Sequence, residues 1–248
     1  MPLAALIFDV DGTLADTERD GHRPAFNQAF ADAGLDWHWD VALYGALLSV
    51  TGGKERMQHY VEHYRHEPVD TALIARLHAR KTQCYTELLA RQAIPLRPGV
   101  RRLLVEARSA GITLAIATTT TPANVTALLE ATLGADAPGW FAVIGAGDVV
   151  PHKKPAGDIY QYVLQALGLR AEACFAFEDS RNGLRSARAA GVQTVVTVND
   201  YTRSEDFAGA TLVLSDLGEP GAPAQVYTGP VAGPVVVDLA LLCRLKDA

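Results

Sequence analysis

The fold of this chain is decided by one stretch near its start, Leu3-Ala4-Ala5-Leu6-Ile7-Phe8-Asp9-Val10-Asp11-Gly12-Thr13. Its apolar half predicts a buried strand, and the acidic residues and glycine after it predict a loop at the strand's carboxyl end. Asp9 and Asp11 are two residues apart, so both carboxylates point to the same side of extended backbone. Two carboxylates this close repel unless a cation or a shared proton relieves them, and their oxygens suit Mg²⁺. The stretch therefore predicts a strand that leads into a magnesium site.

Beyond residue 92, strands and helices alternate along the chain. Apolar strands are predicted at 112–117, 141–144, 173–177, 192–198 and 211–214, and helices at 101–110, 123–132, 158–167 and 182–190. Such alternation, with near-continuous apolar strands, indicates a parallel sheet that helices cover on both faces. The Gly/Pro-rich segment 218–233 is expected to be an irregular surface loop, and 238–245 a closing helix.

Residues 16–91 differ, because helical periodicity dominates there and no convincing strand is visible. The fold class is therefore α/β, with a doubly wound, Rossmann-like parallel sheet. We expect a core of residues 1–15 and 92–248, interrupted by an all-helical cap domain of residues 16–91. An insertion at the carboxyl end of a strand lies over the place where open α/β sheets bind ligands. We expect the cap to act as a lid.

The composition of the chain excludes several classes of partner and location. The formal net charge of −6 argues against nucleic acid as the main partner, since a basic footprint is missing. No apolar run is long enough to span a membrane, and the N-terminus lacks the basic leader of a secretory signal. The three cysteines are far apart with no CxxC spacing, which indicates neither disulfides nor zinc. We expect a cytoplasmic monomer that acts on a small molecule.

Three further polar segments follow predicted strands or precede predicted helices, and with the segment 9–13 they make four stations, that is, four short segments of candidate site residues. Thr118-Thr119-Thr120-Thr121 can form an anion cradle from hydroxyl and backbone N–H groups near a helix N-terminus. Lys154, in Lys153-Lys154-Pro155, can neutralise a phosphate or an aspartate nucleophile, and Glu178-Asp179 can complete a metal shell. Taken singly, each station could be a turn, a helix cap or a solvated loop. Their occurrence in order favours a phosphoryl-transfer site.

The four stations resemble the motifs of the haloacid dehalogenase superfamily, over nearly the whole chain apart from the Gly/Pro-rich tail. The matching residues are Asp9-Val10-Asp11-Gly12-Thr13-Leu14, Thr118, Lys154-Pro155 and Glu178-Asp179-Ser180-Arg181-Asn182-Gly183. The inserted helices match the cap that β-phosphoglucomutases and related phosphatases carry between the first two motifs. By this resemblance Asp9 is the nucleophile that forms an aspartyl-phosphate, and Asp11 is the general acid and base.

The same resemblance implies the cofactor and its ligands. Mg²⁺ would be bound by Asp9, by the backbone carbonyl of Asp11 and by Asp179, with Glu178 nearby or contributing. Thr118 and Lys154 would hold the transferring phosphoryl group. A carboxylate nucleophile divides phosphoryl transfer into two steps, and the cationic charges stabilise its transition state.

The cap is expected to choose the substrate. Its cations Lys54, Arg56, Arg80 and Lys81 could together grip a second, remote phosphate, which favours a sugar bisphosphate. Glu18 and His22, just past the first motif, are expected to reach substrate hydroxyls. Asp20-Gly21 and Pro24 flank His22 where an uninterrupted helix is expected, and they should loosen the helix start.

A closer resemblance is to the CbbY branch of the superfamily, which is associated with carbon fixation and hydrolyses xylulose 1,5-bisphosphate. It rests on Trp39-Asp40 with Tyr44, and on the segments 51–56, 78–85 and 117–120. It implies that xylulose 5-phosphate and phosphate are the products, and that Tyr44, Gly53, Thr119 and Thr120 also bind substrate. Two alternatives stay open: a phosphomutase of β-phosphoglucomutase type, which uses the same aspartates, and a phosphatase of another small sugar phosphate.

Overall fold

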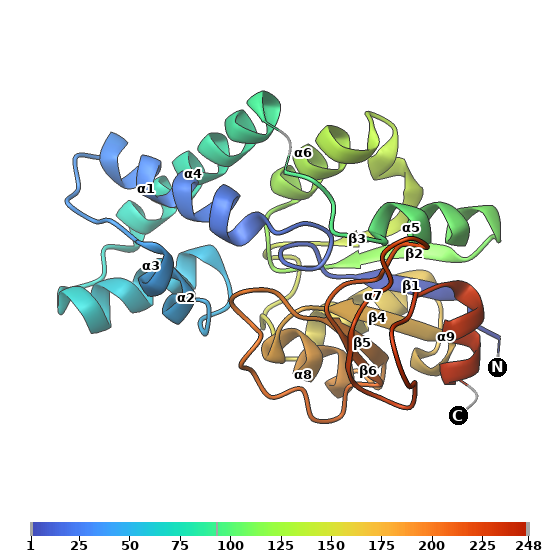
Figure 1. The fold of residues 1–248 in the computed structure, drawn as a ribbon. Helices are drawn as coiled ribbons and strands as arrows, with labels where there is room; N and C mark the ends of the chain where they lie inside the picture. Colours follow the sequence, from blue (N-terminus) through green and yellow to red (C-terminus); the bar gives the residue numbers. More distant parts are fainter. Residues whose placement is uncertain (1, 93, 247–248) are drawn as a thin grey trace.

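A computed structural model of the protein describes residues 2–92 and 94–246 and shows a seven-stranded sheet with helices on both faces (Figure 1). The strands are β1 (Ala5–Phe8), β2 (Thr113–Ala117), β3 (Phe141–Gly145), β4 (Cys174–Glu178), β5 (Gln193–Thr197), β6 (Leu212–Leu214) and β7 (Val226–Thr228). Their order is β3-β2-β1-β4-β5-β6-β7, and all neighbours run parallel except β6 and β7. The predicted fold class, a doubly wound parallel sheet, is confirmed.

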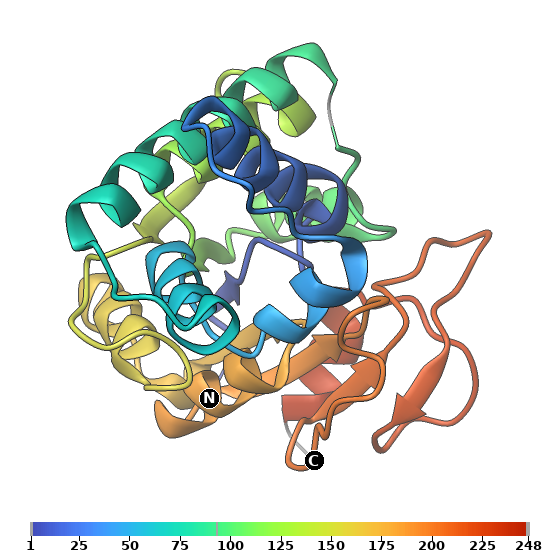
Figure 2. The same ribbon diagram turned by 90° about the vertical axis from the view of Figure 1, so that its left-hand side faces the viewer.

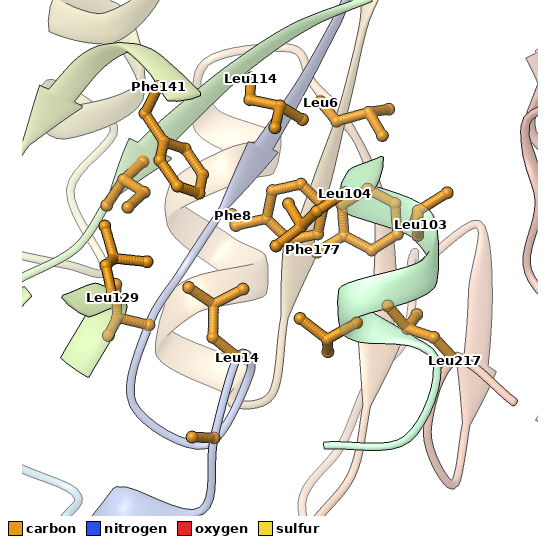
Figure 3. Packing of buried hydrophobic residues seen from close by; sticks show 14 of the residues in the cluster. Leu6, Phe8, Leu14, Leu103, Leu104, Leu114, Leu129, Phe141, Phe177 and Leu217 are labelled. Carbon is orange, nitrogen blue, oxygen red and sulfur yellow. The ribbon is translucent and has the colours of Figure 1, made fainter. Parts of the chain in front are cut away.

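Alternation along each strand divides the core into two layers. Leu6 and Phe8 of β1 belong to a large hydrophobic cluster, whereas Ala5 and Ile7 belong to a second cluster on the opposite face. The first cluster is covered by α5 (Val100–Ser109), α6 (Pro122–Leu133) and α9 (Leu239–Lys246), and the second by α7 (Asp158–Leu167) and α8 (Arg181–Ala189). Figure 3 shows the large side chains of the first cluster packed around Phe8 and Phe177, whose rings stack at 4.5 Å.

The register of the central strands places their carboxyl ends side by side. Phe8, the last residue of β1, pairs with Ile116 of β2 on one side and with Phe177 of β4 on the other. The polar residues that follow these strands therefore emerge at one edge of the sheet. The strand order reverses at β1, since β2 and β3 lie on one side of it and β4 and β5 on the other, and such a switch point is where open α/β sheets bind ligands.

Helices from the predicted cap range lie beyond this edge (Figure 1). They are η1 (Glu18–His22), α1 (Arg23–Asp32), α2 (Val41–Leu47), α3 (Gly53–Tyr60), η2 (Val61–Arg65) and α4 (Thr71–Arg91). They enclose an aromatic core of their own, centred on Trp39, Phe26 and Phe30. Figure 2, which looks from this side, shows the helices in front of the sheet. The domain boundaries themselves stay a prediction.

Two local expectations are corrected. The tail predicted to be irregular contains β7, which pairs antiparallel with the edge strand β6. This strand has three residues between glycines and prolines, so no alternation pattern could reveal it. The helix start around His22 keeps its helical course: η1, a π-helix, runs directly into α1, so the flanking glycine and proline go with one widened turn and do not interrupt the helix.

In the described part of the chain, no helix is both long and apolar enough for a membrane crossing. Cys84, Cys174 and Cys243 are free thiols.

Candidate active site

The side chains predicted for the core chemistry meet in one cavity of about 100 Å³ at the carboxyl edge of the sheet. Asp9 and Asp11 follow β1, Thr118 follows β2, and Asp179 follows β4. Lys154 reaches the cavity from the loop before α7. Asp9, Thr118, Lys154 and Asp179 are all more than nine-tenths buried, so little water screens their charges.

Lys154 is the cation at the centre of this cavity. Its Nζ donates to Asp9 Oδ1 at 2.6 Å and to Glu178 Oε1 at 2.7 Å. Burial alone would lower the pKa of Lys154, but the charges of Asp9 and Glu178 raise it above its ordinary value, so the ammonium stays charged. Burial raises the pKa of Asp9 to about 7, with Glu178 and Asp11 adding to the rise and Lys154 opposing it. The single positive charge of Lys154 does not neutralise the negative charges of the carboxylates around it.

Three of these carboxylates fit a metal ion. Asp9, Glu178 and Asp179 each offer an oxygen, and the three oxygens lie within 4.8 Å of one another. Burial and the charges of Asp9 and Glu178 raise the pKa of Asp179 well above its usual range. A cluster of hard oxygens with excess negative charge is the donor set that Mg²⁺ prefers. The residues present therefore fit the Mg²⁺ ion that the sequence predicted.

Asp11 is turned away from this cluster, toward the cap. Its Oδ1 accepts hydrogen bonds from Thr17 Oγ1 at 2.5 Å and from His22 Nε2 at 2.7 Å, and Lys81 Nζ lies 2.8 Å from His22 Nδ1. Burial would raise the pKa of Asp11, but the charge and hydrogen bond of His22, together with Thr17 and Lys81, lower it to about 2. The aspartate is therefore ionised and connected through His22 to the cap residue Lys81.

A second, smaller cavity of about 40 Å³ adjoins the first, and Asp11, Glu18, Arg56 and Thr119 line both. Its other lining residues include His22, Gly53, His78, Lys81, Thr120 and Thr121. Arg56 and Lys81 are buried cations here, and burial lowers the pKa of Lys81 to about 8. The Thr121 hydroxyl, at the N-terminus of α6, has no hydrogen-bond partner among the residues that the structure describes. This compartment is suited to an anion.

Tyr44 lines neither cavity but holds the residues that do. Its hydroxyl donates to Glu18 Oε2 and accepts from Arg56 Nη1 at 2.9 Å. Arg56 also lies 3.8 Å from Glu18 Oε2. Tyr44 thus fixes the cation and the carboxylate that lie between the two cavities.

Besides Tyr44, three predicted residues are not brought into the two described linings. Lys54 Nζ donates to Asp148 Oδ2 at 2.6 Å across the seam between cap and core. Arg80 lies on the outer side of α4, where it pairs with Asp32 at 2.6 Å. Glu178 lies beneath Lys154 rather than in the cavity wall.

The sequence reasoning missed the loop after β5. Asn199 Nδ2 donates to Asp179 Oδ2 at 2.7 Å, and Tyr201, Thr202 and Glu205 also line the first cavity. The signal was present, because this loop too follows the carboxyl end of a central strand. Tyr160 was also missed: its hydroxyl donates to Glu178 Oε1 at 2.6 Å from within α7, and no pattern marks it.

Comparison with known proteins agrees with this geometry. A family model of the haloacid dehalogenase-like hydrolases matches residues 3–191. The chain is 53% identical to the plasmid-encoded protein CbbY of Cupriavidus necator over 245 residues, which cover 97% of this chain and 95% of that protein. It is 54% identical to CbbY of Rhodobacter capsulatus over 217 residues, covering 88% and 95% of the two chains.

Solved structures give the same result. CbbY from Rhodobacter sphaeroides in complex with phosphate matches with a TM-score of 0.82 and 48% identity, covering 88% of this chain and 96% of that one. A mutant of that protein in complex with xylulose-(1,5)bisphosphate matches equally well, with the same TM-score of 0.82. The chain therefore belongs to the haloacid dehalogenase-like hydrolases and is a phosphatase of that family.

Proposed function

We propose that this phosphatase is magnesium-dependent and hydrolyses xylulose 1,5-bisphosphate to xylulose 5-phosphate and phosphate. The observation that carries the proposal is the pair of joined cavities. One contains the nucleophile Asp9 and the lysine Lys154, and the other is lined by the buried cations Arg56 and Lys81. A substrate with a phosphate at each end would match this arrangement. The complex of a close relative with xylulose-(1,5)bisphosphate supports the choice of sugar.

In the first half of the reaction, a carboxylate oxygen of Asp9 attacks phosphorus, and the bond between phosphorus and the sugar oxygen breaks. Lys154 and Thr118, which line the same cavity, hold the phosphoryl oxygens as negative charge spreads over them. A bound Mg²⁺, held by Asp9 and Asp179 with Glu178 nearby, would supply further positive charge to the same oxygens. The product of this half is an aspartyl-phosphate at Asp9 and a free sugar hydroxyl.

Asp11 moves the protons in both halves. It protonates the leaving sugar oxygen, and in the second half it takes a proton from the water that attacks phosphorus. The hydrogen bonds from Thr17 and His22 help to lower the pKa of Asp11, and this favours the ionised form, which can accept a proton. Acting as an acid requires Asp11 to leave these partners, take up a proton from water and turn toward the substrate. Because His22 contacts Lys81, substrate binding to the cap is coupled to this turn.

The second phosphate would lie between Arg56, Lys81 and the N-terminus of α6. Helix N-termini and buried guanidinium groups both favour phosphate. Binding energy from this remote phosphate can close the cap and orient the reacting one. Of the four cations predicted for this task, we assign it to Arg56 and Lys81, and not to Lys54 or Arg80, whose partners are acidic surface residues.

The proposal is tested by phosphate release from a panel of sugar phosphates with Mg²⁺ and with a chelator. The panel contains xylulose 1,5-bisphosphate, ribulose 1,5-bisphosphate, xylulose 5-phosphate and glucose 1-phosphate. We expect the highest kcat/KM for xylulose 1,5-bisphosphate and no release in the chelator. A preference for monophosphates would refute the assignment of the second cavity. Isomerised sugar phosphate without free phosphate would instead show a phosphomutase.

The monomeric state and the cytoplasmic location stay predictions.

A further inference from the structure

Tyr160 lies beneath the catalytic lysine and belongs to none of the motifs that define the site. It is fully buried on α7, among small side chains of β2 and β4 such as Ala115, Ala117 and Ala176. A phenylalanine ring would fill the same space. The hydroxyl group is therefore the feature that requires an explanation, since burying it costs free energy unless it is hydrogen-bonded.

That hydroxyl donates to Glu178 Oε1 at 2.6 Å, the same oxygen that Lys154 Nζ approaches at 2.7 Å. Nζ also lies 5.6 Å from the centroid of the Tyr160 ring, within range of a cation–π contact. Tyr160 thus touches both members of the Lys154–Glu178 pair. The three groups form one buried network in which each position depends on the other two.

Gly183, in the first turn of α8, bounds the opposite side of Glu178. A Cβ at this glycine would overlap Glu178 Oε2, and that oxygen has no hydrogen-bond partner among the described residues. The carboxylate is therefore confined between the Tyr160 hydroxyl and the backbone of Gly183. It occupies a socket of fixed size.

The position of Glu178 matters because Lys154 has three N–H donors. Two of them serve Asp9 and Glu178, at 2.6 and 2.7 Å, and the third is left for the phosphoryl group. If Glu178 moves, the ammonium follows it and the third donor changes direction. We propose that Tyr160 is a positioning residue: it fixes Glu178 in its socket so that the third N–H of Lys154 Nζ points at the phosphoryl group transferred to Asp9. This inference rests on the proposed aspartyl-phosphate chemistry.

The test compares Tyr160→Phe with Tyr162→Phe, the same chemical change on the solvent side of the same helix, where Tyr162 is 37% exposed. Rates are measured with xylulose 1,5-bisphosphate and with para-nitrophenyl phosphate at varied Mg²⁺. For Tyr160→Phe we expect kcat to fall about 10- to 100-fold, the usual effect of losing an outer partner of a charged site group. KM stays unchanged for Tyr160→Phe, and Tyr162→Phe behaves like the wild-type enzyme in every measurement.

Gly183→Ala perturbs the same carboxylate from the other side and should give the same loss in kcat. The double variant with Tyr160→Phe should lose little more than the worse single variant, because both changes displace one group. If the double variant loses the product of the two single losses in kcat, the two substitutions act independently, and the inference is overturned. A normal kcat in Tyr160→Phe would also overturn it, as would a change confined to KM or to the Mg²⁺ requirement.

Asp9→Asn separates this inference from the proposed function. If Asp9→Asn turns over normally, the aspartyl-phosphate chemistry is wrong whatever Tyr160→Phe does. If Asp9→Asn is inactive and Tyr160→Phe is normal, only the role of Tyr160 is wrong.

Discussion

Replacing Lys81 by methionine is expected to make the protein more stable at neutral pH and a poorer enzyme for bisphosphates. The lysine is 4% exposed, with Nζ 2.8 Å from His22 Nδ1 and 4.8 Å from the centroid of the Phe26 ring. Methionine has similar length and reaches the same space without a charge. The variant thus removes a buried cation and leaves the packing of α4 on α1 in place.

The gain in stability follows from the cost of burying the charge. Burial lowers the pKa of Lys81 from its ordinary 10.5 to about 8. At about 1.4 kcal/mol for each tenfold change in acidity, this corresponds to a cost of about 3 kcal/mol at neutral pH. The lost contacts with His22 and the aromatic rings offset about 1 kcal/mol. We therefore expect Lys81→Met to raise the free energy of unfolding by about 2 kcal/mol.

The pH dependence tests the cause. Below about pH 8 the lysine is charged in both the folded and the unfolded protein, so the cost is fully present. Between about 8 and 10.5 the unfolded state binds more protons than the folded state, so wild-type stability rises relative to the variant. Urea unfolding at about pH 7 and about pH 10 should show the gap between the two proteins narrowing at the higher pH.

Enzyme kinetics complete this test. Loss of a hydrogen bond to a charged group should raise KM for the bisphosphate about tenfold or more, with a smaller effect on a monophosphate. A variant that is less stable than wild type at neutral pH would refute the reasoning about the buried charge. An unchanged KM for the bisphosphate would refute the assignment of the second phosphate to Lys81.

Three further changes give distinct outcomes. Arg80→Ala should leave KM for the bisphosphate unchanged, because its guanidinium pairs with acidic surface groups; a rise in KM equal to that of Lys81→Met would contradict this placement. Asn199→Ser, which cannot reach Asp179, should weaken Mg²⁺ binding about tenfold in calorimetry, and wild-type affinity would show that the hydrogen bond does not orient the carboxylate. Asp148→Asn should raise KM by about fivefold or less, since exposed ion pairs such as that between Asp148 and Lys54 contribute at most about 1 kcal/mol. The effect on KM should vanish at high salt, and an effect that persists there would show that it does not come from this ion pair.

The core of the fold was predictable because its signal is local. Each central strand is a short apolar run followed by polar residues, as in Leu6-Ile7-Phe8-Asp9, and helices separate these runs. The same rule located Asp9, Thr118 and Asp179, since residues after parallel strands must emerge at one edge of the sheet. It could also have found Asn199, which follows β5 in the same way.

The cap cations were harder to place, because Arg80 and Lys81 are adjacent on one helix. Adjacent helical residues point about 100° apart, so both could not enter the same cavity. The buried face of α4 contains Ile74, Leu77, Lys81 and Tyr85, and its helical spacing selects Lys81 over Arg80. Tyr160 had no such signal. Its contact with Glu178 depends on how α7 packs against the sheet, which is a tertiary feature that sequence spacing does not express.

The central claim is that Asp9 carries the phosphoryl group between substrate and water. The most direct measurement is acid quenching of a single turnover with xylulose 1,5-bisphosphate, followed by mass spectrometry of the protein's peptides. The account predicts one added phosphoryl group on the peptide that contains Asp9, appearing before free phosphate and absent in Asp9→Asn. Turnover without any phosphorylated peptide, or with the group on another residue, would contradict it.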